Sequence, residues 1–371
     1  MPAHLTLDQL INALSLRDLT DAAQGTHAIQ DLLEQLTQSV QTLWQCPVQL
    51  LRANPLVRVS ENYDALGYPV EGPARDSRYS RYISEQWMLR TQTSTMAPGW
   101  LASWVDKTPR KLALISPGLV YRRDCIDRLH CAEPHQVDIW VLLPKPLDEP
   151  EEVLRAAASD ILHGLLPEHA IHLSPSPHPY TLNGVQIDAL NEQSELVEVG
   201  ECGLIHPYLL TRAGWDNTRM TGIAMGLGLD RILMLRKHMK DIRLLRQEHP
   251  GISAQLQDLN RWRTVSWQPS IMRDLSIAAE NEMDCETLGD QIREAIPEQA
   301  DWIESVEWLG ETPYDELPES ARLRLGLNRE QKNVLVRLVI RHPTRSVSSD
   351  EANVLRERVS RAIHCGGEGR L

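Results

Sequence analysis

The sequence predicts an α+β fold with an antiparallel sheet and a second, smaller α+β domain. Its 371 residues suffice for more than one packed core, and 42% apolar with 24% charged residues is an ordinary globular composition. Strand-like blocks precede helix-like blocks along the first two thirds of the chain, which favours α+β over a doubly wound parallel sheet. The last hundred residues show the order β-α-β-β-α, which is typical of a ferredoxin-like domain.

Periodicity justifies each element of the larger part in turn. Residues 28–44 place apolar side chains at spacings of three and four, which indicates a helix. Residues 111–124 and 135–144 alternate and are predicted to be antiparallel strands, joined by a polar loop over 125–134. Further along we expect a helix at 151–166, strands at 185–190 and 196–207, and, at 222–239, a strand that breaks at Gly226 and Gly228 into a helix.

The chain is expected to divide into four segments. A Pro-Gly dipeptide and a polar stretch mark a linker. Beyond it we expect strands at 270–280, near 305–310 and at 333–341, with helices at 285–296 and 351–363. The predicted segments are an N-terminal helical segment 1–50, a larger domain 51–250, a linker 251–267 and a ferredoxin-like domain 268–371.

Composition and charge exclude several classes of protein. No apolar run reaches the roughly 18 residues of a membrane span and the N-terminus does not resemble a signal peptide, so we expect a cytoplasmic protein without a membrane partner. Six scattered cysteines without a C-x-x-C pair argue against a disulfide framework or zinc ribbon. The net charge is −13, and phenylalanine is absent. Residues 280–320 hold fourteen acidic residues against one basic residue, whereas 321–371 hold eleven basic against five acidic, so a polyanionic partner would meet the tail.

Two predicted neighbouring strands carry polar side chains two residues apart. On the first, Arg122 and Asp124 would share a face, where an arginine fork can hold a phosphate; a surface ion pair is the alternative. On the second, Gln136 and Asp138 would share a face. An amide and a carboxylate inside a sheet need a partner, which a ligand ammonium or a cross-strand group would supply.

The segment GLGLDR at residues 226–231 joins two glycines to an arginine. It lacks the G-x-G-x-x-G spacing and the Gly-Lys-Ser/Thr ending of the common nucleotide motifs. Glycines two apart permit close backbone approach, with helix packing as the alternative. Arg231 falls in the first helical turn, and together with Arg122 it suits a triphosphate held in a bent shape.

Several segments resemble, in order and spacing, the catalytic core of phenylalanyl-tRNA synthetases, which are class II enzymes. These segments are ENYDALGYPVEGPARD (61–76), LRTQTST (89–95), VYRRDCIDRLHCAEPHQVD (120–138), VEVGECGLIHPYLL (197–210), GIAMGLGLDRILML (222–235) and KDIRLLR (240–246). Residues 268–371 resemble the ferredoxin-fold anticodon-binding domain that is fused to the catalytic domain in the monomeric, organelle-type enzymes. The resemblance spans roughly residues 54–371, and the ordered set is far more specific than any single motif.

The resemblance implies ATP-dependent activation of an amino acid and its transfer to tRNA. ATP with Mg²⁺ would lie bent over the sheet near Gly228, with Arg122 on the α-phosphate and Arg231 on the γ-phosphate. The substrate carboxylate would attack the α-phosphorus, so catalysis would be positioning plus electrostatic stabilisation. By the same resemblance the amino acid would meet Gln92, Ser94, Gln136 and Asp138, with Asp124 near the nucleotide or amine and Glu198 near Mg²⁺.

The chain departs from the family pattern at the substrate pocket. The family usually has His where this chain has Gln92, and Glu where it has Asp138. The two phenylalanines that usually wall the pocket are replaced by Ile223 and Met225. Losing two ring contacts would weaken phenylalanine binding by roughly tenfold or more, with Met225 offsetting part of the loss.

Two hypotheses follow from these departures. The first is a synthetase that charges tRNA with phenylalanine or another apolar amino acid. The second is a paralogue that activates a different amino acid for a non-tRNA acceptor, or binds without catalysis. The resemblance is compatible with a monomer or a homodimer, and tRNA would meet basic residues of the tail: Arg322, Arg324, Arg329, Lys332, Arg337, Arg341 and Arg345.

Overall fold

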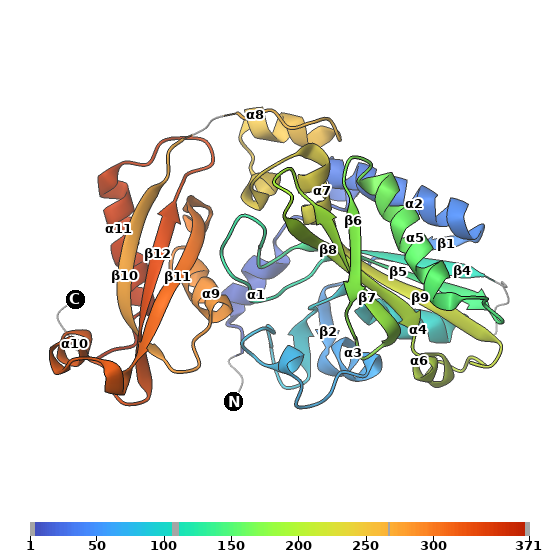
Figure 1. The fold of residues 1–371 in the computed structure, drawn as a ribbon, viewed down its shortest axis with the longest axis horizontal. Coiled ribbons are helices and arrows are strands. Elements are labelled where there is room, and N and C mark those ends of the chain that lie inside the picture. Colours follow the sequence, from blue (N-terminus) through green and yellow to red (C-terminus); the bar gives the residue numbers. More distant parts are fainter. Residues whose placement is uncertain (1–3, 106–110, 266–267, 368–371) are drawn as a thin grey trace. The chain divides into compact units, whose positions relative to one another are not determined.

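The computed structural model describes residues 4–105, 111–265 and 268–367 and divides the chain into two compact units (Figure 1). The first unit consists of residues 1–122, 133–240 and 254–262. The second consists of residues 123–132, 241–253 and 263–371. Among the described residues, no helix has both the length and the apolar character needed to cross a lipid bilayer.

A seven-stranded sheet forms the centre of the first unit, in the order β1-β4-β5-β9-β8-β7-β6. Every neighbouring pair is antiparallel except β1 and β4, which confirms the predicted α+β class with its antiparallel sheet. A separate antiparallel pair, β2 and β3, lies outside this sheet. The strands are β1 (Val48–Leu50), β2 (Leu56–Arg58), β3 (Trp87–Leu89), β4 (Leu112–Leu119), β5 (His135–Pro144), β6 (Ile171–Pro175), β7 (Thr181–Leu190), β8 (Leu196–Ile205) and β9 (Met220–Gly228).

Helices α2 (Ala28–Trp44) and α5 (Pro150–Leu165) pack side by side on one face of this sheet (Figure 1). The predicted helical spacing explains why, because Leu32, Leu36 and Val40 are completely buried. Burial of one such side chain contributes about 1.5–3 kcal/mol. The remaining helices of the unit are α1 (Leu7–Leu14), α3 (Val59–Asn62), α4 (Ala97–Ser103), α6 (Pro207–Arg212) and α7 (Leu229–Lys237).

The other face of the sheet changes from apolar to polar along its strands. Toward one end Leu142, Trp140 and Ala224 join a buried cluster with side chains from α4 and α6. Further along the same face of β5 come Asp138 and then Gln136. The apolar end fixes the strands, and the polar end is the part available for chemistry.

The first predicted strand is shorter than the sequence suggested. Residues 111–124 were expected to be extended throughout, but β4 ends at Leu119. Beyond it the chain turns to other partners, because the Tyr121 N–H donates to the carbonyl of Arg90 (2.9 Å) and Arg122 bridges to Ser80. The expected sharing of one strand face by Arg122 and Asp124 is therefore wrong.

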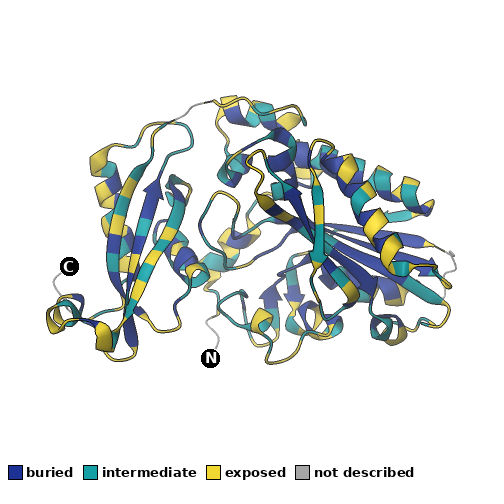
Figure 2. Cartoon of the chain, in the orientation of Figure 1, coloured by how far each residue is buried: buried dark blue, intermediate teal, exposed yellow. Residues whose placement is uncertain are grey.

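The second unit contains a three-stranded antiparallel sheet in the order β10-β12-β11. Helices α9 and α11 pack on one face, where alternate residues such as Val334, Val336 and Leu338 are completely buried (Figure 2). Ile126, from the segment 123–132, belongs to the same core. The elements are α8 (Pro250–Ser253), β10 (Ile271–Glu280), α9 (Cys285–Ala295), β11 (Ile303–Pro313), α10 (Glu319–Leu325), β12 (Gln331–Ile340) and α11 (Ser349–Ile363).

Candidate functional site

Polar residues and glycines form a continuous row across three central strands of the large sheet. Asp138 on β5 and Glu201 on β8 both lie opposite Gly226 on β9, and Gln136 lies opposite Gly228 in the next row. Directly opposed residues share a face of the sheet. A Cβ atom on Gly226 would lie 3.1 Å from Gln136 Nε2, so this glycine is what leaves room for the amide. The two glycines form an open floor between acidic and amide side chains.

Asp138 is a buried carboxylate whose oxygens both receive hydrogen bonds. It is 1% exposed, and its two oxygens accept hydrogen bonds from the hydroxyls of Thr93 (2.7 Å) and Ser94 (2.6 Å). Burial raises the pKa of Asp138, while the two hydroxyls act in the opposite direction. The structure thus brings together Ser94 and Asp138, two of the residues expected to contact the amino acid.

Arg122 lies at the edge of this row. Its Nε donates to the carbonyl of Thr91 (2.8 Å), and its Nη2 lies 3.4 Å from Gln136 Oε1. The side chain is exposed, so the guanidinium is held from one side and open to solvent on the other. This arrangement presents a fixed positive charge to a ligand lying over the row.

Arg231 approaches the same place from the third residue of α7. Its Nη1 donates to the carbonyl oxygen of Glu198 on β8 (3.1 Å). Removal of water raises the pKa of the Glu198 carboxyl, whereas the positive charges of Arg231 and of Arg122 lower it. Both arginines therefore act electrostatically on the Glu198 carboxyl.

A buried pair, His135 and Asp230, fixes the start of α7. The backbone N–H of Leu19 donates to His135 Nε2 (3.0 Å), so the other ring nitrogen carries the proton and donates to Asp230 Oδ1 (2.9 Å). Asp230 also accepts a hydrogen bond from the His135 backbone N–H. Because Asp230 precedes Arg231, the His135–Asp230 pair fixes the position of Arg231 without itself facing the glycine row.

Sequence reasoning missed a second group of side chains beside the row. His178, Tyr180 and Glu201 line a small hollow of about 10 Å³, with Ala224 and Gly226 among its other walls. His178 Nε2 lies 2.5 Å from a carboxylate oxygen of Glu201. The hydrogen bond to Glu201 raises the pKa of His178 against the effect of burial. The available signal was a histidine and a tyrosine among prolines at residues 175–180, just before a strand.

Aromatic rings support this hollow. The Tyr180 ring stacks on Trp140 with 5.9 Å between centroids and lies 6.1 Å from the Tyr68 ring. The Tyr68 hydroxyl donates to Gln92 Oε1 (3.0 Å), and Gln92 Nε2 donates to the carbonyl of Asn62 (3.1 Å). Gln92 is therefore bonded to Tyr68, whose ring lies beside that of Tyr180, a residue that lines the hollow.

Three further expected residues are not part of the row. Ile223 and Met225 lie opposite Val141 and Ile139 of β5, so their side chains project from the face opposite to Asp138. Met225 borders the hollow from within the sheet, whereas Ile223 is not among its lining residues. Asp124 belongs to the second unit, where its carbonyl accepts a hydrogen bond from Arg293 (2.5 Å).

The donor set fits a magnesium ion carried by a polyphosphate. Mg²⁺ typically takes one or two carboxylates and completes its shell with phosphate oxygens and water. Glu198 interacts electrostatically with Glu201 and with both arginines, so it offers a carboxylate for such an ion. The one group of three potential ligands found among the described residues lies in the second unit and is a different kind of site: Cys125, Cys285 and Glu286.

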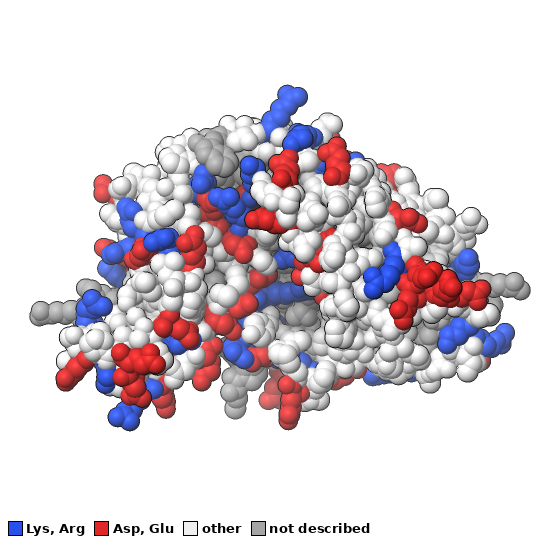
Figure 3. Space-filling model, in the orientation of Figure 1, with Lys and Arg blue, Asp and Glu red and all other residues white. Residues whose placement is uncertain are grey.

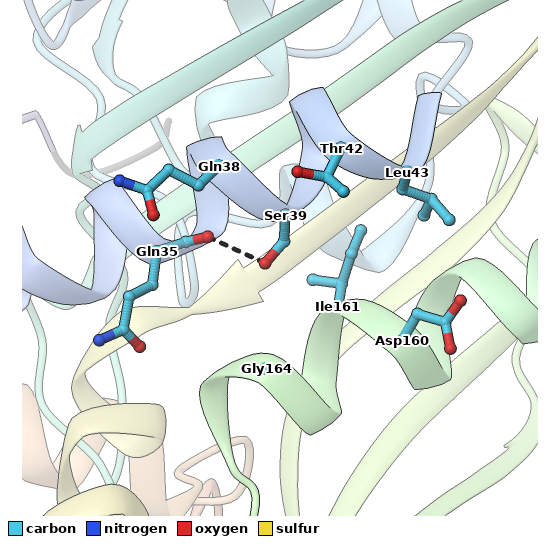
Figure 4. A pocket seen from close by; sticks show the side chains of 8 residues that line it. All are labelled: Gln35, Gln38, Ser39, Thr42, Leu43, Asp160, Ile161 and Gly164. Atoms are coloured by element: carbon cyan, nitrogen blue, oxygen red, sulfur yellow. Dashed lines mark hydrogen bonds between the residues drawn. The ribbon is translucent and has the colours of Figure 1, made fainter. Parts of the chain in front are cut away.

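A larger but shallower groove lies between α2 and α5 (Figure 4). It has a volume of about 480 Å³ and is lined by amides, hydroxyls and apolar groups, with Asp160 as its one charged side chain. Ser39, which lines it, uses its hydroxyl to bond the carbonyl of Gln35 (2.9 Å). Without converging charges this groove offers less chemistry than the sheet face.

Charges in the second unit are largely paired with one another. Lys332 bonds Glu311 (2.7 Å), Arg337 bonds Asp274 (2.8 Å), and Arg345 bonds Glu351 (2.9 Å); Arg341 pairs with Glu304. Figure 3 shows basic and acidic side chains interspersed over the face it draws. The basic tail and the acidic segment before it thus neutralise each other in part.

Comparison with known proteins assigns the chain to a family. Residues 14–256 match the model of the "tRNA synthetases class II core domain (F)". The chain is 35% identical over 183 residues to the phenylalanine–tRNA ligase alpha subunit of Alteromonas mediterranea, and 34% identical over 186 residues to that of Chromobacterium violaceum. Each match covers 49% of this chain and 54% of the relative, so the chain spans about half the length of these relatives.

One solved structure also aligns with part of the chain. A pyrrolysyl-tRNA synthetase from Desulfitobacterium hafniense aligns with a TM-score of 0.47 and 15% identity, over 62% of this chain and 76% of that chain. The family model covers well over half of the chain, including the sheet, its glycine row and both arginines. The chain belongs to the class II tRNA synthetase core family.

Proposed function

We propose that this chain activates an amino acid with ATP and transfers it to tRNA, in the manner of a phenylalanine–tRNA ligase with an altered side-chain pocket. The placement of Arg122 and Arg231 around the glycine row carries this proposal: Arg122 lies beside Gln136, and Arg231 bonds the backbone carbonyl of Glu198. Two guanidinium groups beside a glycine floor suit a folded triphosphate, since each can bond phosphate oxygens bidentately. Mg²⁺, when bound with ATP beside Glu198, would neutralise phosphate charge.

The protein's contribution to activation is orientation and charge. The substrate carboxylate attacks the α-phosphorus, a carboxylate–phosphorus bond forms, and pyrophosphate leaves with the electrons of the broken bond. Arg122 would stabilise charge on the α-phosphate and Arg231 would hold the γ-phosphate, while Gln136 and Asp138 would orient the ammonium group. The acyl group then passes to a hydroxyl of the acceptor and AMP leaves.

ATP–pyrophosphate exchange with each standard amino acid tests the proposal. We expect exchange with at least one amino acid, and its loss by about 100-fold or more in Arg122→Ala and Arg231→Ala, because each removes a fixed charge at the transition state. Arg155→Ala, an exposed change on α5 behind the sheet, is the matched control. A folded Arg231→Ala protein with normal exchange would contradict the assigned role.

The pairing of charges in the second unit favours keeping a second candidate, a paralogue with a non-tRNA acceptor. For a tRNA ligase, residues 268–371 would be the anticodon-binding domain, and binding of unmodified tRNA should weaken steeply with salt. Aminoacylation of tRNA and a gel-shift salt series distinguish the candidates. ATP–pyrophosphate exchange that is accompanied neither by tRNA charging nor by salt-dependent tRNA binding supports the second candidate.

A further inference from the structure

We infer that the amino acid taken by this site carries a hydrogen-bond donor on its side chain, and that Glu201, held by His178, recognises that donor. The inference rests on the proposed function and names its substrate class. It differs from the expectation of phenylalanine or another apolar amino acid.

The geometry places Glu201 where a substrate side chain would end. Asp138 and Glu201 flank Gly226 in one row, so their strands are two spacings apart, or about 10 Å. Gly226 projects no side chain between them. An amino acid with its ammonium beside Asp138 therefore directs its side chain along the row toward the hollow lined by His178, Tyr180 and Glu201.

The Glu201 carboxylate makes the hollow a hydrogen-bond acceptor for a ligand. His178 uses Nε2 for Glu201, 2.5 Å away, and its ring also interacts with the Ser176 backbone. The Glu201 carboxylate has lone pairs beyond the one that His178 engages. A hydroxyl, amide, amine or similar donor can bond that carboxylate, whereas an acceptor or an apolar group cannot.

Binding of an apolar side chain in the hollow would cost free energy. Filling the hollow with a hydrocarbon group would exclude water from Glu201, which is one-third exposed, without replacing the lost hydrogen bonds. Such a loss disfavours the apolar amino acid by about 10- to 100-fold. The volume of about 10 Å³ is close to the room that one water molecule needs, so it suits a single small polar group.

Exchange assays with matched amino-acid pairs test this inference. The pairs differ by a donor at similar size: threonine and valine, serine and alanine, asparagine and leucine, tyrosine and phenylalanine, lysine and methionine. We expect the best substrate to carry a donor and to exceed its apolar partner at least tenfold in kcat/KM. Glu201→Ala should reduce that ratio at least tenfold, mainly by lowering activity with the donor substrate, and Glu201→Gln should restore part of it.

Controls separate recognition from folding. Glu168→Ala breaks another surface glutamate–histidine pair, with His238, and should leave the ratio unchanged. A purely structural role for Glu201 would lower activity with both members of a pair equally, which would overturn the inference. Preference for an apolar amino acid would also overturn it while leaving the proposed activation intact. Absence of exchange with every amino acid would instead remove the proposed function.

Discussion

At the scale of single residues, the site depends on how buried charges are compensated. Asp138 is buried yet receives two hydroxyl hydrogen bonds, whereas Glu201 is less buried and pairs with a histidine. Burial of a charged carboxylate without such partners would cost several kcal/mol, and in practice the group would become protonated instead. The two acidic residues of the row are therefore stabilised differently: Asp138 by neutral hydroxyl donors, and Glu201 by a histidine that can be protonated.

The His178–Glu201 pair gives the pocket a pH dependence of known sign. The hydrogen bond to Glu201 raises the pKa of His178 above its ordinary 6.5. The stabilisation from the pair is therefore complete below pH 6.5 and is lost as pH rises through the higher native pKa. An NMR titration of the His178 ring should show this elevated value.

Glu201→Gln serves as the control for that titration. It removes the charge but keeps the side-chain shape, so the pKa of His178 should return toward 6.5. A wild-type His178 that titrates at or below 6.5 would contradict the pairing.

At the scale of elements, the junction between β9 and α7 concentrates the functional constraints. Gly226 and Gly228 leave the floor open, and Arg231 follows within one helical turn. The first turn of α7 carries its own anchor, because Asp230 is 3% exposed and bonded to the ring and backbone of His135. The start of β5 and the start of α7 are thus held together by the Asp230 side chain.

Replacing that anchor should cost both stability and activity. Asp230→Asn keeps the shape but removes the charge that His135 bonds, so we expect a loss of about 1–3 kcal/mol in the free energy of unfolding. The shift of α7 should also reduce exchange through Arg231. Urea unfolding measures the first effect, with exposed Asp148→Asn as control. Unchanged stability in Asp230→Asn would show that the pair is dispensable.

Sequence patterns predicted elements better than they predicted their partners. Helical spacing in α2 and strand alternation in β5 follow from local rules, and both elements are present at the expected residues. The end of β4 at Leu119 depends on contacts of residues 120–122 with segments far away in sequence, which periodicity cannot reveal. Arg122, Arg231 and Asp138 were identifiable from motifs. The involvement of His178 and Glu201 depends on strand register, which the sequence alone does not specify.

At the scale of the whole molecule, the two units share the chain in an interleaved way. The chain passes between them after residues 122, 132, 240, 253 and 262. The segment 123–132 leaves the first unit directly after Arg122, and in the second unit Ile126 is buried while Arg293 bonds the carbonyls of Asp124 and Cys125. A loop between two strands of one sheet therefore owes its conformation to the other unit.

Truncation after residue 262 should release this loop. In the full chain Arg123 is paired with Asp290 and Arg128 with Glu304, which protects the segment. A fragment of residues 1–262 lacks these partners, so trypsin should cleave after Arg123 and Arg128 at least tenfold faster. Mass spectrometry of the digest identifies the sites, and Arg155 serves as an internal reference. Equal cleavage in both forms would show that the second unit does not order the loop.

The interleaving has a consequence for how this architecture is inherited. A module attached by a single tether can be acquired or discarded through one recombination event, with its neighbour left intact. Here a stretch that begins one peptide bond beyond Arg122 forms part of the other unit's interior, so excision would leave Ile126 without its hydrophobic surroundings. The two parts are thereby constrained to change over evolutionary time as a pair.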